Sequence, residues 1–345
     1  MLPSPLVVEV RRGAVADVAQ ALRDRHVSAS GAVVVAVGPS QGEAIWESIR
    51  DSLPDAVPFE VRDASLATAA RLQEAMAGRG YDAVVGIGGG RTLDVAKYAA
   101  TRAGVPMVAV ATNLAHDGLC SPVASLQHAH GKGSYGVAMP LAVFVDLDYV
   151  ATAPRGLVTA GVGDVVSNLS AVADWWLAHD VRGEPVDGLA SALARNAAEA
   201  VLRREDGVED DDFLVTLAEA LVLSGMAMSV AGSSRPCSGA CHEILHAVDQ
   251  LYPGTSNHGE LAGVGALFAT YLRGDTTLLG ELRRCLTRHG LATTPEALGL
   301  TEQQFVAAVL AAPQTRPDRY TVLEHLALDE AGAAAAVAGF LADAG

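Results

Sequence analysis

The first 153 residues alternate short apolar runs with stretches of helical periodicity. Residues 32–37 and 83–87 are two such runs, and each is followed by a glycine, Gly38 or Gly88. Uninterrupted apolar runs of this length are typical of strands buried on both faces of a parallel sheet. We predict further strands at 6–10, 59–62, 105–111 and 142–145, a hairpin at 122–135, and helices at 14–26, 42–53, 66–78 and 93–102. The alternation therefore predicts an α/β domain built on a doubly wound parallel sheet.

Near Pro154 the pattern changes, and no strand is predicted from there to Gly345. Helical periodicity covers residues 163–178, 189–203, 213–230, 241–251, 261–272, 277–289, 303–310 and 331–342. We therefore expect two domains, an α/β domain over 1–153 and an all-helical domain over 154–345.

One segment of the helical part has the length and composition of a membrane span. Residues 213–234 carry a single charge, Glu219, over about the length that crosses a bilayer. Polar and small residues such as Ser224, Gly225 and Gly232 interrupt the segment, and no Lys or Arg precedes its start. We interpret it as the central buried helix of the helical domain.

Charge and cysteine content limit the partners and the compartment. The formal net charge is −16, and such a surface repels phosphate backbones and anionic lipid. We therefore expect no nucleic-acid binding and no membrane insertion, and an anionic substrate would need a local basic pocket. The four cysteines form no Cys-x-x-Cys pair, and the N-terminus has no signal-peptide pattern, so we expect a cytoplasmic protein.

Three consecutive glycines, Gly88, Gly89 and Gly90, stand between a predicted strand and a predicted helix. They let the backbone approach a ligand closely, and the helix N-terminus offers free N–H groups to a pyrophosphate. We predict nucleotide binding here, although a tight strand-to-helix turn would also use glycine. Asp94 and Lys97 lie on the first helical turns, where they could orient the loop, contact a ribose, or be solvated.

Residues 233–260 hold three of the ten histidines. His242 and His246 share one face of the predicted helix, and His258 follows shortly after. Histidines at this spacing could bind a divalent metal, or be solvated or satisfied in a core. Asp164 follows two closely spaced glycines, so it could cap a helix or supply a carboxylate ligand. Asp164, His242 and His258 together would form a two-histidine, one-carboxylate site.

Three segments carry a family resemblance: His116-Asp-Gly-Leu-Cys-Ser-Pro122, Ser233-Ser-Arg-Pro-Cys-Ser-Gly239 and Arg316-Pro-Asp-Arg-Tyr-Thr-Val-Leu-Glu324. With the glycine loop and the His-Gly-Glu at 258–260, the chain resembles the sn-glycerol-1-phosphate dehydrogenase family. That family lies within the superfamily of iron-containing alcohol dehydrogenases, glycerol dehydrogenases and dehydroquinate synthases. The resemblance implies a Rossmann-like domain followed by a helical metal-binding domain, and a homo-oligomer.

The resemblance also implies cofactors and site residues. The family resemblance implies a divalent metal, Zn²⁺, on Asp164, His242 and His258. It also implies that His246 lies near the substrate rather than on the metal. NAD or NADP is expected between the domains, with its phosphates on Gly88, Gly89 and Gly90. The remaining cofactor contacts are expected from Asp94, Thr112, Ser121 and Val123, and Asp117 is expected beside the substrate.

The implied reaction is reduction of dihydroxyacetone phosphate to sn-glycerol 1-phosphate. We expect the metal to polarise the carbonyl and His246 to act as the acid, with Asp117 as the second catalytic residue. Arg235 is the first candidate for binding the phosphate, with Arg316 and Arg319 behind it, and Lys132 is expected to be a loop charge.

Two departures from the family pattern concern the substrate. Cys241 stands where relatives commonly have Glu before the first metal histidine, and residues 110–115 read Val-Ala-Thr-Asn-Leu-Ala rather than Val-Pro-Thr-x-x-Ser. Cys241 and Ala115 could border the substrate pocket, so a different phosphorylated ketone or a polyol is an alternative. A cyclase like dehydroquinate synthase is a second, although residues 118–125 contain no lysine. A non-catalytic binding protein is a third.

Overall fold

A computed structural model describes residues 4–129 and 131–344, and the chain divides into two units, Met1–Pro154 and Arg155–Gly345. The predicted boundary lies one residue from this division. Each unit is described by itself.

The first unit is built on a six-stranded parallel sheet with the order β1-β8-β5-β4-β2-β3. The strands are β1 (Val7–Arg11), β2 (Val33–Val37), β3 (Val57–Glu60), β4 (Ala83–Gly88), β5 (Met107–Ala111) and β8 (Ala142–Asp146). The inner strands are buried along their whole length, as their apolar runs predict. The predicted parallel α/β fold is therefore confirmed.

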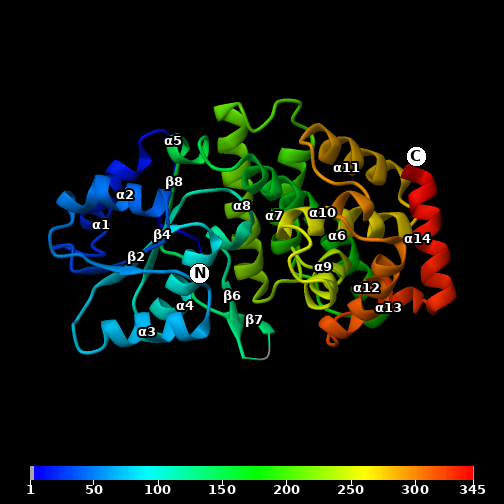
Figure 1. The fold of residues 1–345 in the computed structure, drawn as a ribbon, viewed down its shortest axis with the longest axis horizontal. Coiled ribbons are helices and arrows are strands. Elements are labelled where there is room, and N and C mark those ends of the chain that lie inside the picture. Colours follow the sequence, from blue (N-terminus) through cyan, green and yellow to red (C-terminus); the bar gives the residue numbers. More distant parts are fainter. Residues whose placement is uncertain (1–3, 130, 345) are drawn as a thin grey trace. The chain divides into compact units, whose positions relative to one another are not determined.

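Helices cover both faces of this sheet (Figure 1). One face carries η1 (Ala14–Asp17), α1 (Val18–Asp24) and α2 (Gln41–Ile49), which runs into η2 (Arg50–Ser52). The other carries α3 (Leu66–Met76) and α4 (Gly90–Ala103). The short α5 (Leu147–Val150) follows β8.

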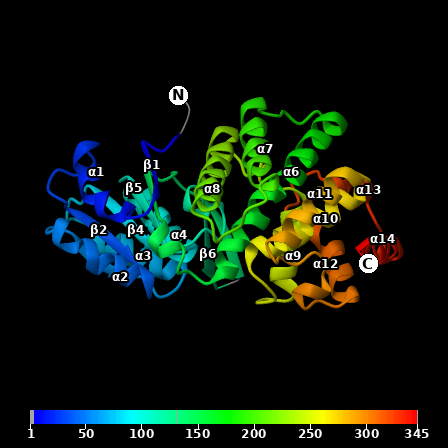
Figure 2. The ribbon, with the colours of Figure 1, turned by 90° about the horizontal axis from the view of Figure 1, so that it is seen from above.

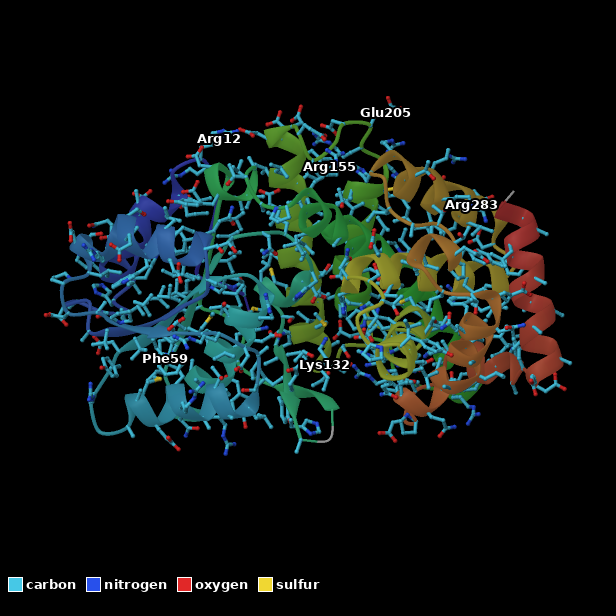
Figure 3. All side chains as sticks on the ribbon, viewed as in Figure 1. Arg12, Phe59, Lys132, Arg155, Glu205 and Arg283 are labelled. Atoms are coloured by element: carbon cyan, nitrogen blue, oxygen red, sulfur yellow. The ribbon has the colours of Figure 1, made fainter. Side chains whose placement is uncertain are left out.

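The predicted hairpin is formed by β6 (Val123–His128) and β7 (Gly131–Gly136), which pair antiparallel outside the main sheet. It follows η3 (Asp117–Leu119). Lys132 lies on β7 with its side chain exposed (Figure 3), as expected for a surface charge.

The second unit is helical throughout its described residues, as predicted (Figure 2). Its helices are α6 (Arg155–Arg182), α7 (Gly188–Leu202), α8 (Asp211–Ala231), α9 (Ala240–Leu251), α10 (His258–Leu272), α11 (Thr276–Arg288), η4 (Glu296–Leu298), α12 (Glu302–Thr315), α13 (Val322–Leu326) and α14 (Glu330–Ala344). Helices α6 and α10 pack against each other along their lengths, and α9 packs on both. These three helices carry the candidate metal ligands.

The largest difference from the prediction is in α6, which begins at Arg155, eight residues before the predicted start at Gly163. Asp164 consequently lies inside the helix, and the interpretation of Asp164 as a helix cap is wrong. Gly161 and Gly163 predict a helix boundary because glycine disfavours helix interiors. Here the cost of Gly163 is compensated by a close helix–helix contact described below.

Two helices, Arg155–Arg182 and Asp211–Ala231, are long and apolar enough to cross a bilayer by length and composition. In the first, 83% of the most apolar window is buried inside the protein, and in the second 61%. Helix α8 covers the segment that we interpreted as a buried core helix, and its predominant burial agrees with that interpretation.

Candidate metal and nucleotide sites

The candidate metal ligands are brought together by a close crossing of α6 and α10. A Cβ atom on Gly163 would collide with the carbonyl of Gly259, and one on Gly259 would collide with the carbonyl of Ala160. Only glycine at both positions lets the two backbones approach this closely. Asp164 and His258 are the immediate neighbours of these glycines, so the contact that requires glycine also sets the carboxylate beside the imidazole.

Three ligand atoms converge at this crossing. The Asp164 Oδ1 atom lies 3.6 Å from His242 Nε2 and 3.5 Å from His258 Nε2, and the two Nε2 atoms are 3.2 Å apart. A tetrahedral ion with bonds of about 2.1 Å would hold its ligand atoms about 3.4 Å from one another. The donor set, two imidazole nitrogens and one carboxylate oxygen, is also one that Zn²⁺ accepts. The residues present therefore fit a divalent ion with a further coordination position open.

Burial and charge make this cluster electrostatically unusual. Asp164 is only 4% exposed and His242 only 8%. Burial alone would raise the pKa of Asp164, but hydrogen bonds and charge from His242 and His258 outweigh it and hold that pKa below its usual range. The carboxylate is thus ionised at neutral pH, as a metal ligand must be. The His258 side chain is 31% exposed and marks the accessible side of the cluster.

Cys241 lies on the opposite side of the His242 ring from the cluster. Its Sγ atom is 3.3 Å from His242 Nδ1, and the side chain is fully buried between Ala171 and Ala266. Burial raises the pKa of Cys241 to about 11, so its thiol is protonated at neutral pH. The sulfur contacts the ring nitrogen that faces away from Asp164 and so helps to orient the imidazole.

His246 lies one turn after His242 on α9, with the two ring centroids 6.3 Å apart. Among the described residues, the group of potential metal ligands comprises Asp164, His242 and His258 without His246. His246 Nε2 is instead 3.1 Å from the guanidinium of Arg316. The structure therefore places a cation directly beside the histidine that we expect near the substrate.

Arg235, the first candidate for binding a phosphate, has other partners. Its Nε atom donates to Glu184 Oε1 at 2.6 Å, its Nη2 atom pairs with Glu184 Oε2, and both Nη atoms lie 3.2 Å from the Tyr320 carbonyl. Arg319 likewise donates to the Ser238 carbonyl and the Ser234 hydroxyl. Both guanidiniums hold the 316–324 segment to its surroundings. Arg316, which follows the last residue of α12, is the arginine of this segment that contacts His246.

The glycine loop lies at the switch point of the sheet. Strands β2 and β4 are neighbours in the sheet. After β2 the chain continues to β3 on one side, and after β4 it continues to β5 on the other, so the two connections run in opposite directions. Ligands of open α/β sheets bind at this point, outside the carboxyl ends of the strands. Helix α4 starts there at Gly90, and its N-cap residue Gly89 supplies no side-chain cap. The first backbone N–H groups of α4 therefore remain suited to an anion.

Most of the other predicted cofactor residues gather around this loop. The Thr112 N–H donates to the Gly88 carbonyl at 3.1 Å, at the end of β5. Asp117 begins η3, and its carbonyl accepts hydrogen bonds from the N–H groups of Cys120 and Ser121. Ser121 is buried, and Val123, which begins β6, is partly buried.

Lys97 and Asp94 hold the 117–125 segment against α4. Lys97 is fully buried, and its Nζ atom lies 3.0 Å from Asp94 Oδ1 and 2.8 Å from the Gly118 carbonyl. It also contacts the carbonyls of Ser121 and Val123. The other Asp94 oxygen accepts the Ser125 N–H at 3.0 Å. Both side chains are buried rather than solvated, and their contacts orient the 117–125 segment rather than the glycine loop.

The α/β unit matches one class of protein, the iron-containing alcohol dehydrogenases. The family model described as iron-containing alcohol dehydrogenase matches residues 9–154. The crystal structure of a probable glycerol dehydrogenase from Sinorhizobium meliloti 1021 shares the fold with a TM-score of 0.79 at 22% identity, covering 99% of this chain and 98% of that one.

Within this class, the chain belongs to the glycerol-1-phosphate dehydrogenase family. It is 36% identical over 324 residues to glycerol-1-phosphate dehydrogenase (NAD(P)+) of Hyperthermus butylicus, which covers 92% of each chain. It is 40% identical over 340 residues to the enzyme of that name from Thermofilum pendens, covering 95% of this chain and 94% of that one. The resemblance predicted from the three sequence segments is confirmed.

Proposed function

We propose that the protein reduces dihydroxyacetone phosphate with NADH or NADPH and a proton, and forms sn-glycerol 1-phosphate and the oxidised nucleotide. The family membership supports the oxidoreductase reaction. The observation that carries the metal dependence is the convergence of Asp164, His242 and His258 at separations of 3.2 to 3.6 Å. A divalent ion bound there would supply Lewis-acid polarisation of the ketone.

The chain's own residues prepare this site in three ways. The ionised Asp164 supplies one negative charge in a buried position, which offsets part of the charge of a divalent ion. His242 and His258 present their Nε2 atoms to the same point. The Cys241 thiol occupies the far side of the His242 ring and helps to fix its orientation.

We assign the substrate phosphate to Arg316 rather than to Arg235. Among the described residues, the Arg316 guanidinium has a hydrogen bond to His246 and no ion pair with a carboxylate, although the charge of Glu243 acts on it, whereas Arg235 is paired with Glu184. Burial lowers the pKa of Arg316, which means that its charge is poorly solvated and would be stabilised by an anion. A guanidinium also binds two phosphate oxygens at once.

His246 remains the candidate for proton transfer to the alkoxide oxygen of the product. Arg316 has only donors, so the His246 Nε2 atom that faces it accepts the hydrogen bond. The neutral ring then carries its proton on Nδ1 and would hold, by that N–H group, the water molecule through which solvent supplies the proton, so that no imidazolate forms. Asp117, which lies in the α/β unit, stays the second predicted catalytic residue.

For the nucleotide, we propose that the diphosphate binds at the N–H groups that begin α4, beside Gly88, Gly89 and Gly90. Thr112, Ser121 and Val123 would line the ribose and nicotinamide, and bound NAD(P)H would supply the hydride. Asp94 would act through the position of the 117–125 segment. We also propose that the ion is Zn²⁺ and that the protein is a cytoplasmic homo-oligomer.

Phosphate dependence tests this function. Purified protein with Zn²⁺ should oxidise NADH or NADPH in the presence of dihydroxyacetone phosphate and far more slowly with dihydroxyacetone. Equal rates with both ketones would favour a polyol dehydrogenase. Conversion of a phosphorylated substrate without net nucleotide consumption would indicate a cyclase. Binding of Zn²⁺ and nucleotide without turnover of either ketone would contradict the proposal.

A further inference from the structure

The metal-bearing helices share a second buried carboxylate, Asp174. Asp164 and Asp174 are the only charged residues of α6 between Leu157 and His179. Asp174 is fully buried, and it lies ten residues, or about 15 Å, along the helix from Asp164. A charge in such a position costs stability unless it is fully paired. Asp174 must therefore be satisfied by groups from the surrounding helices.

One oxygen of Asp174 caps the helix that carries His242. The Ala240 N–H, the first of α9, donates to Asp174 Oδ2 at 2.8 Å. The N-cap residue of α9 is Gly239, which has no side chain to cap the helix. A Cβ atom at Gly239 would collide with Asp174 Oδ2 itself and with the backbone of Ala171. The glycine thus leaves room for a carboxylate from another helix, which caps Ala240, two residues before His242.

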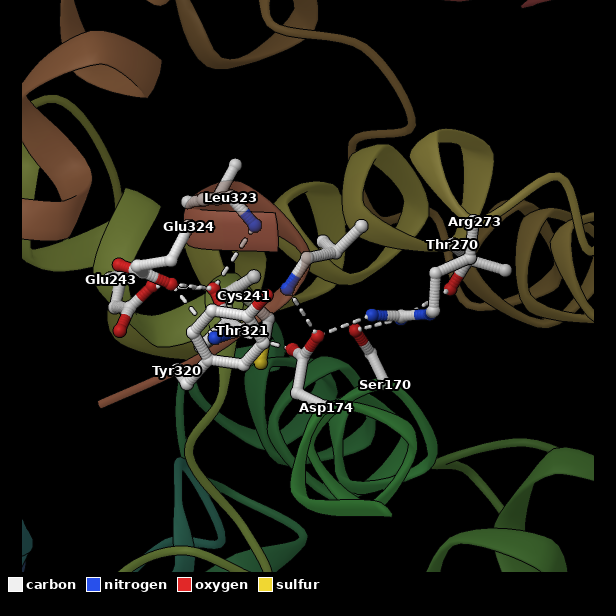
Figure 4. A network of polar contacts seen from close by, with 12 residues as sticks. Ser170, Asp174, Cys241, Glu243, Thr270, Arg273, Tyr320, Thr321, Leu323 and Glu324 are labelled. Atoms are coloured by element: carbon white, nitrogen blue, oxygen red, sulfur yellow. Dashed lines mark hydrogen bonds and ion pairs between the residues drawn. The ribbon is translucent and has the colours of Figure 1, made fainter. Parts of the chain in front are cut away.

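The other oxygen of Asp174 reaches the helix that carries His258 (Figure 4). Arg273, which follows the last residue of α10, donates from Nη1 to Asp174 Oδ1 at 2.7 Å. Its Nη2 atom donates to the Ser170 hydroxyl on α6 at 2.6 Å. This charged pair is largely shielded from solvent, with the Arg273 side chain 15% exposed. The guanidinium therefore fixes the end of α10 opposite His258 against α6.

The same oxygen also fixes the C-terminal segment. The Val322 N–H donates to Asp174 Oδ1 at 2.9 Å. The preceding Thr321 hydroxyl lies 3.0 Å from Glu243 Oε2, next to His242 on α9 (Figure 4). Asp174 thus accepts hydrogen bonds from α9, α10 and α13 while it belongs to α6. Each of the three helices that carry a candidate metal ligand therefore contacts this network: α6 through Asp174 itself, α9 at its first residue and α10 at the residue after its end.

We propose that Asp174, with Arg273 as its partner, positions the metal ligands by locking the N-terminus of α9 and the C-terminus of α10 onto α6. The inference rests on the proposed metal site. Helices move as stiff units, so a shift of the α9 N-terminus would move His242 Nε2 away from Asp164 and His258. Loss of groups that orient metal ligands typically weakens metal binding about tenfold to a hundredfold.

The experiment measures Zn²⁺ affinity by competition with a chromogenic chelator. Asp174→Asn keeps the size of the side chain but replaces one of its two acceptor oxygens with an NH₂ group. That group would face the donors that the lost oxygen now accepts from. We expect its Zn²⁺ dissociation constant to rise at least about tenfold. NAD(H) affinity, measured in the same protein, should stay within about twofold, because the nucleotide loop belongs to the other unit. Asp343→Asn, which removes the charge that pairs with Arg283 between α11 and α14, is the control and should keep the parental Zn²⁺ affinity.

Arg273→Lys provides a second variant should Asp174→Asn fail to fold, since it keeps the charge but loses one of the two anchoring contacts. It should weaken Zn²⁺ binding less than Asp174→Asn and more than Asp343→Asn. A Zn²⁺ affinity equal to the parent in a folded Asp174 or Arg273 variant would overturn the proposal, even if its melting temperature were lower. A parent protein that binds no divalent ion would instead overturn the metal site and the positioning role together.

Discussion

Arg316 donates a hydrogen bond to His246 across 3.1 Å, and His246 lies one helix turn after the proposed metal ligand His242. In the part of the chain that the structure describes, this cation has no ion-paired carboxylate, and we propose that it binds the phosphate of the ketone. Arg316→Ala should therefore raise the KM for dihydroxyacetone phosphate about tenfold to a hundredfold, the value of one hydrogen bond between charged groups. Steady-state kinetics at saturating nucleotide measures it.

Arg316→Lys should recover part of this loss, since the point charge remains but the two-point contact does not. The KM for the nucleotide should not change in either variant. A large effect of Arg235→Lys on the substrate KM, with none from Arg316→Ala, would mean that Arg235 binds the phosphate instead.

The close contact between α6 and α10 predicts opposite effects for two glycines of the same helix. Gly163→Ala should destabilise the protein by about 1–3 kcal/mol and weaken Zn²⁺ binding, because the new methyl group meets the Gly259 carbonyl. Gly156→Ala should stabilise it by about 0.5–1 kcal/mol, because nothing lies within 4 Å of that position. Chemical unfolding of the two variants and the parent, with and without Zn²⁺, measures the changes in stability and in Zn²⁺ binding. Equal effects would mean that the helices can separate without cost.

The buried pair of Lys97 and Asp94 predicts a loss of both stability and nucleotide binding. Lys97→Met leaves Asp94 without its cation and releases the Gly118, Ser121 and Val123 carbonyls. Breaking a buried ion pair in this way costs about 3–5 kcal/mol. We expect a lower melting temperature and a raised NAD(H) dissociation constant. Lys132→Met, at an exposed position on β7, is the control and should change neither quantity by much.

His289 predicts a loss of stability in mild acid. Its side chain is buried and stacked on Phe213 at 4.8 Å between ring centroids, and its Nε2 atom has no hydrogen-bond partner within residues 4–129 and 131–344. Burial, with the charges of Arg288 and Arg155, lowers the pKa of His289 to about 4 from a usual value of 6.5. The unfolded chain therefore binds a proton between these pH values that the folded chain does not. The lowered pKa of His289 should therefore reduce the free energy of unfolding by up to about 3 kcal/mol as the pH falls from 6.5 to 4.

Thermal unfolding of His289→Gln and of the parent over this pH range measures the contribution of His289 to the pH dependence of stability. The difference in stability between the two proteins should shift in favour of the variant as the pH falls. His26→Asn, at an exposed position, should follow the parent. Parallel pH profiles for all three proteins would show that His289 is protonated in the folded state.

Periodicity was enough to predict the two-part architecture, because parallel strands need apolar runs and surface helices need an apolar face. It misplaced the start of α6, since Gly163 disfavours a helix locally and is required only by contact with Gly259. The ligand set was suggested by spacing and chosen by family resemblance. The partners of Arg235 and the buried role of Asp174 depend on residues far apart in the sequence, such as Glu184 and Arg273, so no local pattern could predict them.

The most direct test of the account is metal removal and return. The protein is stripped with chelator, and NADH and NADPH oxidation by dihydroxyacetone phosphate is followed as Zn²⁺ is added back. We expect no activity in the stripped protein and a recovery that saturates near one Zn²⁺ per chain, while His258→Ala stays inactive at the same addition. Full activity in protein shown to be free of divalent metal, or equal activity in His258→Ala, would contradict the assignment of Asp164, His242 and His258 as the catalytic metal site.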